Sequence, residues 1–252
     1  MDHTDIDRAG NDTATPADET ERVQMGGDEP SGSDDGGQSG SEGGSRGYHH
    51  GDLKSALIRA TIDLIREKRL EDVSVADAAR RARVSSGAPY RHFKDRDDLI
   101  AHVAAEGFMR LSEAERVATV HHPVGTVDRI IALGCSYTEF GVDNHELFHV
   151  MWSAARHENA PEVARIAGEA SYRGVIQEFS ATMAAQGLGH LDPNEFGAPL
   201  WAMVHGFSSL LIVRPKMLRA DRDSVRKRIA DATRAYFLGH AVQAVDRGTD
   251  RG

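Results

Sequence analysis

The chain has 252 residues, of which 40% are hydrophobic and 27% charged, a composition typical of a soluble globular protein with one or two domains. Its single cysteine, Cys135, excludes an intrachain disulfide. The first residues lack the basic start and apolar run of a signal peptide, and no stretch approaches about 18 consecutive apolar residues. We therefore expect a cytoplasmic protein without a membrane partner.

The formal net charge of -9 is unevenly distributed along the chain. Residues 1–45 carry 2 basic and 12 acidic side chains and are rich in Gly and Ser. Such a segment cannot bury enough apolar surface to offset its ordering entropy, so we expect a disordered tail. It is either a solvated tail without a role or an acidic segment that competes with phosphates. Residues 46–94 carry 11 basic and 6 acidic side chains, which favours a nucleic-acid partner because charge at the contact surface matters more than the total.

Hydrophobic residues recur at helical spacing from residue 52 onward. We expect a first helix capped by Asp52, a second over residues 75–82 capped by Ser74, and a third over residues 85–93. A fourth helix follows Asp95, which forms a pair typical of a capping box with the acidic residue three positions later. The residues expected on the buried face of this fourth helix are Leu99, Ile100, Val103, Phe108 and Leu111. Four short, closely spaced helices suit a small three-helix module with a connector.

Longer amphipathic stretches follow, and no run alternates with the period of a strand. The helices expected from them span residues 126–141, 145–157, 161–186, 193–213 and 221–245. The fold class is therefore all-α, with an N-terminal helical module over residues 46–111 and a C-terminal helical region over residues 112–252.

Residues 74–99 carry the pattern that is most informative about function. A helix-turn-helix needs a bracing helix, a tight turn and a second helix that enters the major groove. The second helix expected here begins with small side chains, which let its backbone approach base edges, and continues with side chains that can donate to phosphates. The small residues are Ser85, Ser86, Gly87 and Ala88, and the donors are Tyr90, His92 and Lys94. Small and polar residues at a helix start also occur in other proteins, so the spacing favours DNA binding without deciding it.

The sequence YHHGDL at residues 48–53, followed by VSSGAPYRHFKDRDDLI at residues 84–100, resembles the TetR (tetracycline-repressor) family, in the subgroup that opens with Tyr-His-His-Gly. The resemblance implies a three-helix DNA-binding domain with a helix-turn-helix over residues 46–111. It also implies a larger helical domain over residues 112–252 that dimerises and binds an effector. Tyr90 and Lys94 are the strongest candidates for phosphate contacts, and Ser86 and Ala88 for bases. The DNA-facing segment that the resemblance implies comprises Ser74, Ser85, Ser86, Ala88, Pro89, Tyr90, His92 and Lys94.

Two arginines depart from the family pattern. The family usually has glycine where this chain has Arg69, after the first helix, and Arg83, in the turn of the helix-turn-helix. Glycine there suits a left-handed backbone, which costs other residues about 1–2 kcal/mol. Either the turns differ slightly in this chain, or the strain is accepted for extra positive charge near DNA. Pro89 lies inside the expected recognition helix, where it occupies N3 if Ser86 is the cap and N4 if Ser85 is.

Residues 201–206 resemble the Trp-His-Gly signature of a C-terminal domain found in the same subgroup. Trp201 and His205 are i, i+4 neighbours on one helix face. They form either a wall of an effector pocket or a packed Trp and a hydrogen-bonded core His near a close helix contact at Gly206. Other aromatic residues can line the pocket or simply fill the core at this helical spacing. These candidates are Phe140, Phe148, Trp152 and Phe179.

His145-Glu146-Leu147-Phe148-His149 matches the H-E-x-x-H signature of zinc metalloproteases, in which two histidines at i, i+4 hold the metal and the glutamate acts as base. In a chain with 13 histidines the match has poor specificity, and a catalytic site also needs a third ligand and usually an adjoining sheet. His145 and His149 are therefore weak metal candidates, and we expect no cofactor and no enzymatic activity.

These observations predict a TetR-type repressor that binds a near-palindromic operator as a homodimer and is released by an unknown small molecule. The two subunits would pair through the last two long helices and hold their recognition helices about 34–36 Å apart. Such a protein would be cytoplasmic and associated with the nucleoid. The alternatives are a metal-dependent hydrolase and a DNA-binding protein whose large domain only dimerises.

Overall fold

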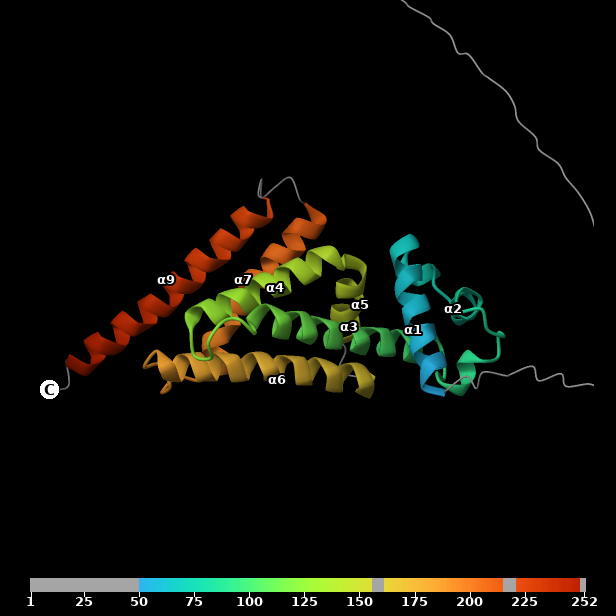
Figure 1. Cartoon of the computed structure of the whole chain (residues 1–252), viewed down its shortest axis with the longest axis horizontal. Coiled ribbons are helices and arrows are strands. Elements are labelled where there is room, and N and C mark those ends of the chain that lie inside the picture. The colour runs from blue at the N-terminus through green and yellow to red at the C-terminus, as the bar shows by residue number, and fades with distance from the viewer. Residues whose placement is uncertain (1–49, 156–160, 215–220, 250–252) are drawn as a thin grey trace, which may run out of the picture. The chain divides into compact units, whose positions relative to one another are not determined.

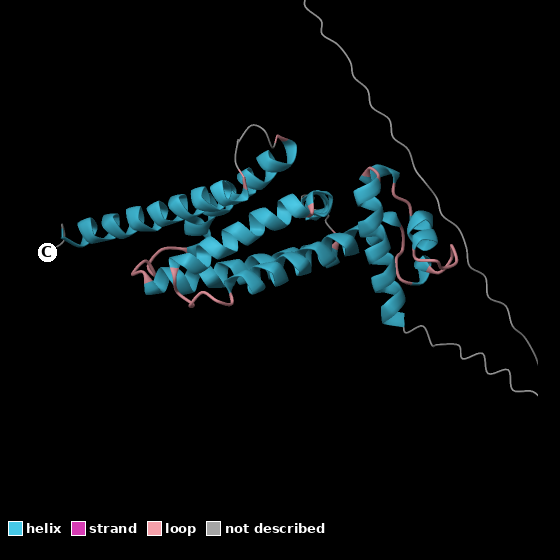
Figure 2. Cartoon of the chain, turned by 45° about the horizontal axis from the view of Figure 1, so that its top comes forward, coloured by secondary structure: helices cyan, strands magenta, loops and turns pink. Residues whose placement is uncertain are grey.

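The computed structural model describes residues 50–155, 161–214 and 221–249, and all regular elements in these ranges are helices. The helices are α1 (His50–Glu67), η1 (Leu70–Asp72), α2 (Val75–Arg81), η2 (Pro89–Arg91), α3 (Arg96–Thr119), α4 (Val127–Asp143), α5 (His145–Ala155), α6 (Glu162–Ala185), α7 (Pro193–Val213) and α9 (Arg222–Thr249). The expected all-α class is confirmed (Figures 1 and 2). The expected acidic tail, residues 1–45, and residues 48–49 of the expected family signature lie outside the described residues.

Side-chain caps define the ends of the helices in the N-terminal module. The Ser74 hydroxyl accepts from the Asp77 backbone N–H, and the Asp77 carboxylate accepts from the Ser74 N–H, so the cap expected at Ser74 is a full capping box. Asp95 caps α3 as expected by accepting from the Asp98 N–H at 2.9 Å. The cap expected at Asp52 is wrong, because α1 begins two residues earlier, at His50.

The third expected helix, over residues 85–93, is also different in the structure. The chain makes a turn in which the Ala88 N–H donates to the Ser85 carbonyl, and only the 3-10 helix η2 follows. Pro89 opens η2 at its first position, where a missing N–H costs nothing. Proline cannot donate back to the preceding turn, which explains why a regular α-helix does not begin before it.

Helix α3 links the N-terminal module to the rest of the described chain. It is 24 residues long and continues through residue 111, the expected end of the DNA-binding domain, so the two domains share this helix (Figure 1). All five residues expected on its buried face are buried. Its N-terminal end packs against α1, and the remainder packs against α4, α5 and α6.

The C-terminal helices pack around α4. The Arg129 guanidinium forms a half-buried ion pair with Glu178, at 2.6 Å and 2.7 Å, and donates to the Thr119 and His122 carbonyls. This arginine therefore joins α4 to α6 and to the end of α3. Helix α7 is long and apolar enough, by length and composition alone, to cross a membrane. In this fold it packs against α4, α6 and α9.

Candidate DNA-binding surface and ligand cavity

The residues expected to face DNA separate into exposed and inward-facing groups. Ser74, Ser85, Ser86, Tyr90 and Lys94 are exposed, whereas Ala88 and His92 are half-buried and Pro89 is buried. The Tyr90 side chain is 61% exposed, unusually far for an aromatic residue. The exposed group therefore presents hydroxyls and one ammonium to solvent over a short length of chain.

A buried aromatic residue holds this segment against the module. Phe93, only 1% exposed, follows η2 and packs edge-on against the His102 ring at 5.2 Å. The Lys54 ammonium of α1 lies 5.9 Å from the centre of the same Phe93 ring, within cation–π range. Phe93 thus holds in place the short segment that carries the exposed Tyr90 and Lys94.

Two of the expected DNA-facing residues point into the module instead. Pro89 is buried, and the Nε2 atom of the half-buried His92 is shielded from solvent. Both residues are therefore less accessible to a phosphate than the exposed Tyr90 and Lys94 are. Ser74 is exposed, but its hydroxyl already donates to the Asp77 carboxylate at 2.8 Å.

The two arginines that replace glycine behave differently. Arg83 has φ +58°, the left-handed conformation expected for the turn between α2 and the following segment. Arg69 has φ -60°, so the backbone there is not left-handed and the turn differs from the one that glycine suits. Arg83 is also exposed, which adds a positive charge beside Ser85 and Ser86.

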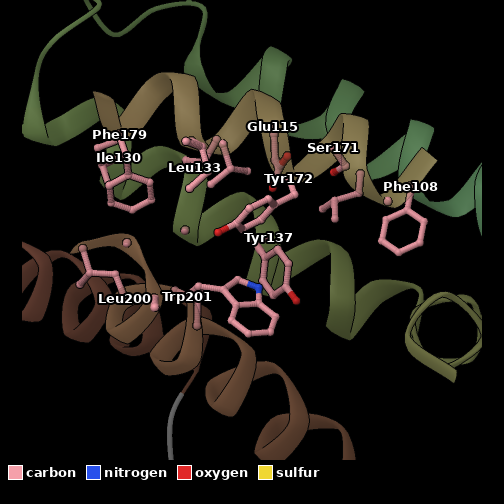
Figure 3. Close-up of a pocket in the computed structure, with 18 of the residues that line it drawn as sticks. Phe108, Glu115, Ile130, Leu133, Tyr137, Ser171, Tyr172, Phe179, Leu200 and Trp201 are labelled. Carbon is pink, nitrogen blue, oxygen red and sulfur yellow. The ribbon is translucent and has the colours of Figure 1, made fainter. Parts of the chain in front are cut away.

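A second candidate site is a cavity of about 540 Å³ in the C-terminal part of the chain (Figure 3). This volume is in the range of cavities that hold drug-sized ligands. Its lining is mostly apolar and comes from residues of α3, α4, α5, α6, α7 and α9. The aromatic and charged lining residues include Phe108, Glu115, Tyr137, Trp152, Arg165, Glu169, Tyr172 and Trp201.

Half of the aromatic residues expected in a pocket line this cavity. Trp152, Phe179 and Trp201 belong to its wall, whereas Phe140, Phe148 and His205 are not among the lining residues. Phe140 and Phe148 are core residues, 8% and 4% exposed.

His205 supports the wall from behind. Its Nδ1 lies 2.8 Å from the Tyr137 hydroxyl, and its ring lies 5.4 Å from that of Trp201 and 5.3 Å from that of Trp152. The expected i, i+4 pairing of Trp201 and His205 is therefore present, with Trp201 in the wall and His205 in the supporting core. The close helix contact expected at Gly206 is absent from the described residues, since a Cβ there would meet nothing within 4 Å.

The cavity contains one buried acidic group. Glu115 of α3 is 5% exposed, and burial raises the pKa of its carboxyl to about 8. Burial, with Glu115 as a further contribution, also raises the pKa of the neighbouring Tyr137. Figure 3 shows the Glu115 side chain directed from α3 into the cavity, toward the side lined by Tyr137 and Tyr172.

Both parts of the chain match known protein families. Residues 57–103 match the family described as bacterial regulatory proteins, tetR family, and residues 130–241 match the tetracyclin repressor-like C-terminal domain. The first match contains the capped helix-turn-helix, and the second contains most of the cavity wall. The chain belongs to the TetR family of transcriptional regulators.

Individual relatives agree with this assignment. The HTH-type transcriptional regulator BetI of Serratia proteamaculans (strain 568) is 26% identical over 152 residues, which cover 55% of this chain and 76% of that protein. A protein of unknown function from Rhodococcus sp. RHA1 has a similar structure, with a TM-score of 0.67, 27% identity and coverage of 77% of this chain and 98% of that one. The TetR family transcriptional regulator PfmR from Thermus thermophilus shares the fold, with a TM-score of 0.53, 16% identity and coverage of 70% and 96%.

The family assignment excludes the metal-dependent hydrolase, since this TetR-family chain is a regulator and not an enzyme. His145 and His149 are exposed on α5, and the His145 Nε2 atom lies 2.7 Å from a carboxylate oxygen of Glu146. Within the described ranges, no three His, Cys, Asp or Glu side chains are placed to share a metal ion.

Sequence reasoning missed candidate residues at both sites of this TetR regulator. Arg91, exposed at the end of η2, lies between Tyr90 and His92 and was passed over because the segment was expected to be a regular helix. Glu115 and Tyr137 were missed because each occupies an ordinary helical position. A glutamate on an otherwise apolar helix face was the one available signal for the cavity.

Proposed function

We propose that this TetR-family regulator is a repressor of the Tyr-His-His-Gly subgroup that binds a near-palindromic operator as a homodimer and leaves it when a small molecule enters the cavity. In a bacterial cell it would be cytoplasmic and associated with the nucleoid. The observation that carries the proposal is that a single helix, α3, begins at the DNA-binding segment and forms a wall of the cavity.

The DNA-binding part of the proposal rests on the exposed polar residues around η2. Tyr90 and Lys94 would donate to phosphates, and Ser85 and Ser86 would approach base edges with Arg83 and Arg91 beside them. Arg80 and Arg81 are also exposed, but each is paired with a carboxylate, Asp77 and Glu67 respectively. The paired arginines would therefore contribute less to phosphate binding.

The homodimer is supported by small and apolar residues that the described chain leaves exposed on α7 and α9. A Cβ at Gly206 or Gly239 would meet nothing within 4 Å, so a second helix can approach both positions closely. Pairing α7 and α9 of two subunits as a four-helix bundle would cover these residues and hold two DNA-binding segments about 34–36 Å apart. The exposed apolar residues on these two helices include Ala198, Trp201, Ala202, Leu210, Val213, Ala235, Leu238 and Val242.

The coupling between cavity and DNA rests on contacts at both ends of α3. At its start, Arg96 donates to the Val73 carbonyl at 2.8 Å and to the Leu70 carbonyl at 2.5 Å, which ties α3 to the loop before α2. Near its middle, Gly107 fits tightly against α5, since a Cβ there would lie 2.5 Å from the Met151 Cγ. A ligand that shifts α3 would therefore shift α2 and η2, provided that it binds one of the two states more tightly.

Selection of DNA from a random pool on the purified full chain tests the proposal. We expect an enriched near-palindrome, a dimer on DNA and a steep fall of affinity with salt. Weak binding without any enriched sequence would refute the DNA-binding function. Enrichment by a monomer would refute the homodimer alone. The rival in which the large domain only dimerises predicts that no compound releases the selected DNA, and the 540 Å³ cavity argues against it.

A further inference from the structure

We propose that the cavity binds an organic cation with an apolar body, and that Glu115 supplies the counter-charge while Tyr137, Trp152 and Trp201 surround the cationic group. The inference rests on the proposed function, because it names the chemical class of the small molecule that would release DNA. Such a cation site differs from a general apolar pocket because its ligand binding requires one particular carboxylate.

The first step is the isolation of Glu115. It is 5% exposed, and no hydrogen bond or ion pair to its carboxylate is found among the described residues. A buried acid normally pairs with a base or with several donors, since an isolated buried charge is costly. Only its backbone carbonyl is engaged, by the Thr119 hydroxyl at 2.8 Å. Packing therefore gives no reason for an acid at this position.

The second step is the aromatic wall. The Trp152 ring lies 5.7 Å from that of Trp201 and 5.7 Å from that of Phe108, and both tryptophans adjoin Tyr137. Tryptophan gives the strongest attraction for a cation over its face, and the attraction increases when water is excluded. Figure 3 shows Tyr172 and Tyr137 on the side of the cavity that Glu115 faces and Trp201 beyond Tyr137, so one cavity holds both a carboxylate and several rings. This combination matches the needs of an alkylated ammonium, which is a poor hydrogen-bond donor but a good cation–π partner.

The third step concerns the other charges that face Glu115. Helix α4 contributes Tyr137, and α6 contributes Arg165, Glu169 and Tyr172. Arg165 and Glu169 neutralise one another, with Nη1 and Oε1 2.7 Å apart. The described lining residues of α5, α7 and α9 carry no charge. An anionic ligand would thus meet Glu115 without an uncompensated positive charge among the described lining residues, whereas a cation would complete a pair.

The fourth step is the linkage to protons. Because burial raises the pKa of Glu115 to about 8, this carboxyl is mostly neutral at pH 7. A cation favours the ionised form, so its binding releases a proton. Its affinity should rise about tenfold per pH unit as the pH increases toward 8 and should level off above that value. A neutral ligand gains nothing from this ionisation.

The test uses intrinsic fluorescence, since both tryptophans of the chain, Trp152 and Trp201, line the cavity. The probes are decyltrimethylammonium, the uncharged decyldimethylphosphine oxide, and decanoate, each titrated below its micellar concentration at pH 6, 7, 8 and 9. We expect the ammonium to bind most tightly at pH 8 and 9 and to weaken about tenfold per unit below pH 8. The phosphine oxide should bind equally at each pH.

Substitutions assign the effect to the carboxylate. Glu115→Gln keeps the shape of the side chain and should abolish the pH dependence and weaken ammonium binding at least tenfold at pH 8, with the phosphine oxide unaffected. Glu113→Gln, the same change two residues away on α3 at an exposed position outside the cavity lining, should alter ammonium binding less than twofold. Trp201→Leu should weaken the ammonium several-fold and spare the phosphine oxide, with Trp152 as reporter.

Three results would overturn the inference. They are equal binding of ammonium and phosphine oxide at pH 8, tighter binding of decanoate than of ammonium, and a pH dependence that survives in Glu115→Gln and so belongs to another group. The assay contains no DNA, so its failure leaves the proposed repressor untouched. Conversely, cation binding without any release of selected DNA would support the ligand class and contradict the release mechanism.

Discussion

The DNA-binding segment and the cavity are built in opposite ways. The segment around η2 is continuous in sequence, and its chemistry lies in exposed side chains such as Tyr90 and Lys94. The cavity takes its wall from six helices, and its chemistry lies in a side chain, Glu115, that is almost fully buried. A function carried by neighbouring residues is visible as a motif, whereas one assembled from distant helices becomes visible only after folding.

The largest expected effect is a loss of stability when Phe93, the buried anchor of the DNA-binding segment, is truncated. The residues proposed to contact DNA should not show this loss. Phe93→Ala removes a ring that is 1% exposed, and truncation of a buried Phe typically costs about 3–5 kcal/mol. We expect a fall of that size in the free energy of unfolding, measured by urea titration at one fixed protein concentration because a dimer makes stability depend on concentration.

Tyr90→Ala is the matched control for Phe93→Ala, since it removes an aromatic ring three residues away that is 61% exposed. It should change stability by less than about 0.5 kcal/mol and still weaken operator binding. Equal destabilisation by the two substitutions would mean that Tyr90 is packed in solution and is not available to DNA.

The next largest expected effect is a dependence of the free energy of unfolding on pH that is caused by Glu115. Its carboxyl has a folded-state pKa raised to about 8 from 4.5 by burial, so the folded protein binds this proton more tightly than the unfolded chain. The contribution of this group to the free energy of unfolding is fully present below about pH 4.5, declines as the pH rises, and is lost above pH 8. At about 1.4 kcal/mol per pKa unit the loss is on the order of 2–4 kcal/mol once water in the cavity is allowed for.

Urea unfolding of the Glu115→Gln variant and the parent at pH 5 and pH 9 measures this pH-dependent contribution of Glu115 directly. The Gln variant should be more stable than the parent at pH 9 and of similar stability at pH 5. A parent that is as stable as the variant at pH 9 would show that the carboxylate is solvated or paired in solution, which would also weaken the case for a cationic ligand.

The sequence predicted the fold better than either site. The long helices were found within a few residues because each buries a continuous apolar face, and the caps at Ser74 and Asp95 follow from local chemistry. The segment over residues 85–93 was misread as an α-helix, because periodicity does not register the turn that precedes Pro89. In the cavity, Trp152 and Trp201 were found as aromatic residues. The one signal for Glu115 was its place on an apolar helix face, and its burial depends on α4 and α6.

A smaller effect concerns the phosphate contacts. Lys94→Ala removes an exposed ammonium and should weaken binding to the selected operator about tenfold. It should also reduce the slope of log affinity against log salt by about one, with little change in sequence preference. Filter binding at four salt concentrations measures both quantities. Lys227→Ala, an exposed lysine on α9 that pairs with Asp231, is the control and should leave the slope unchanged.

The smallest effect concerns the backbone of the turn after α2. Arg83 adopts φ +58°, which glycine tolerates without the strain of about 1–2 kcal/mol that other residues incur, although glycine also makes the unfolded chain more flexible. Arg83→Gly should therefore raise the melting temperature by about 2–3 °C. It should also weaken DNA binding slightly, because a positive charge is lost.

Arg69→Gly provides the opposite case at the other position where glycine was expected. Arg69 has φ -60°, so glycine there relieves no strain and only increases the entropy of the unfolded chain, and the melting temperature should fall by about 2 °C. Calorimetry on the two variants thus measures the turn geometry itself. A rise in both would show that Arg69 also adopts a left-handed conformation in solution, and a fall in both would show that Arg83 does not.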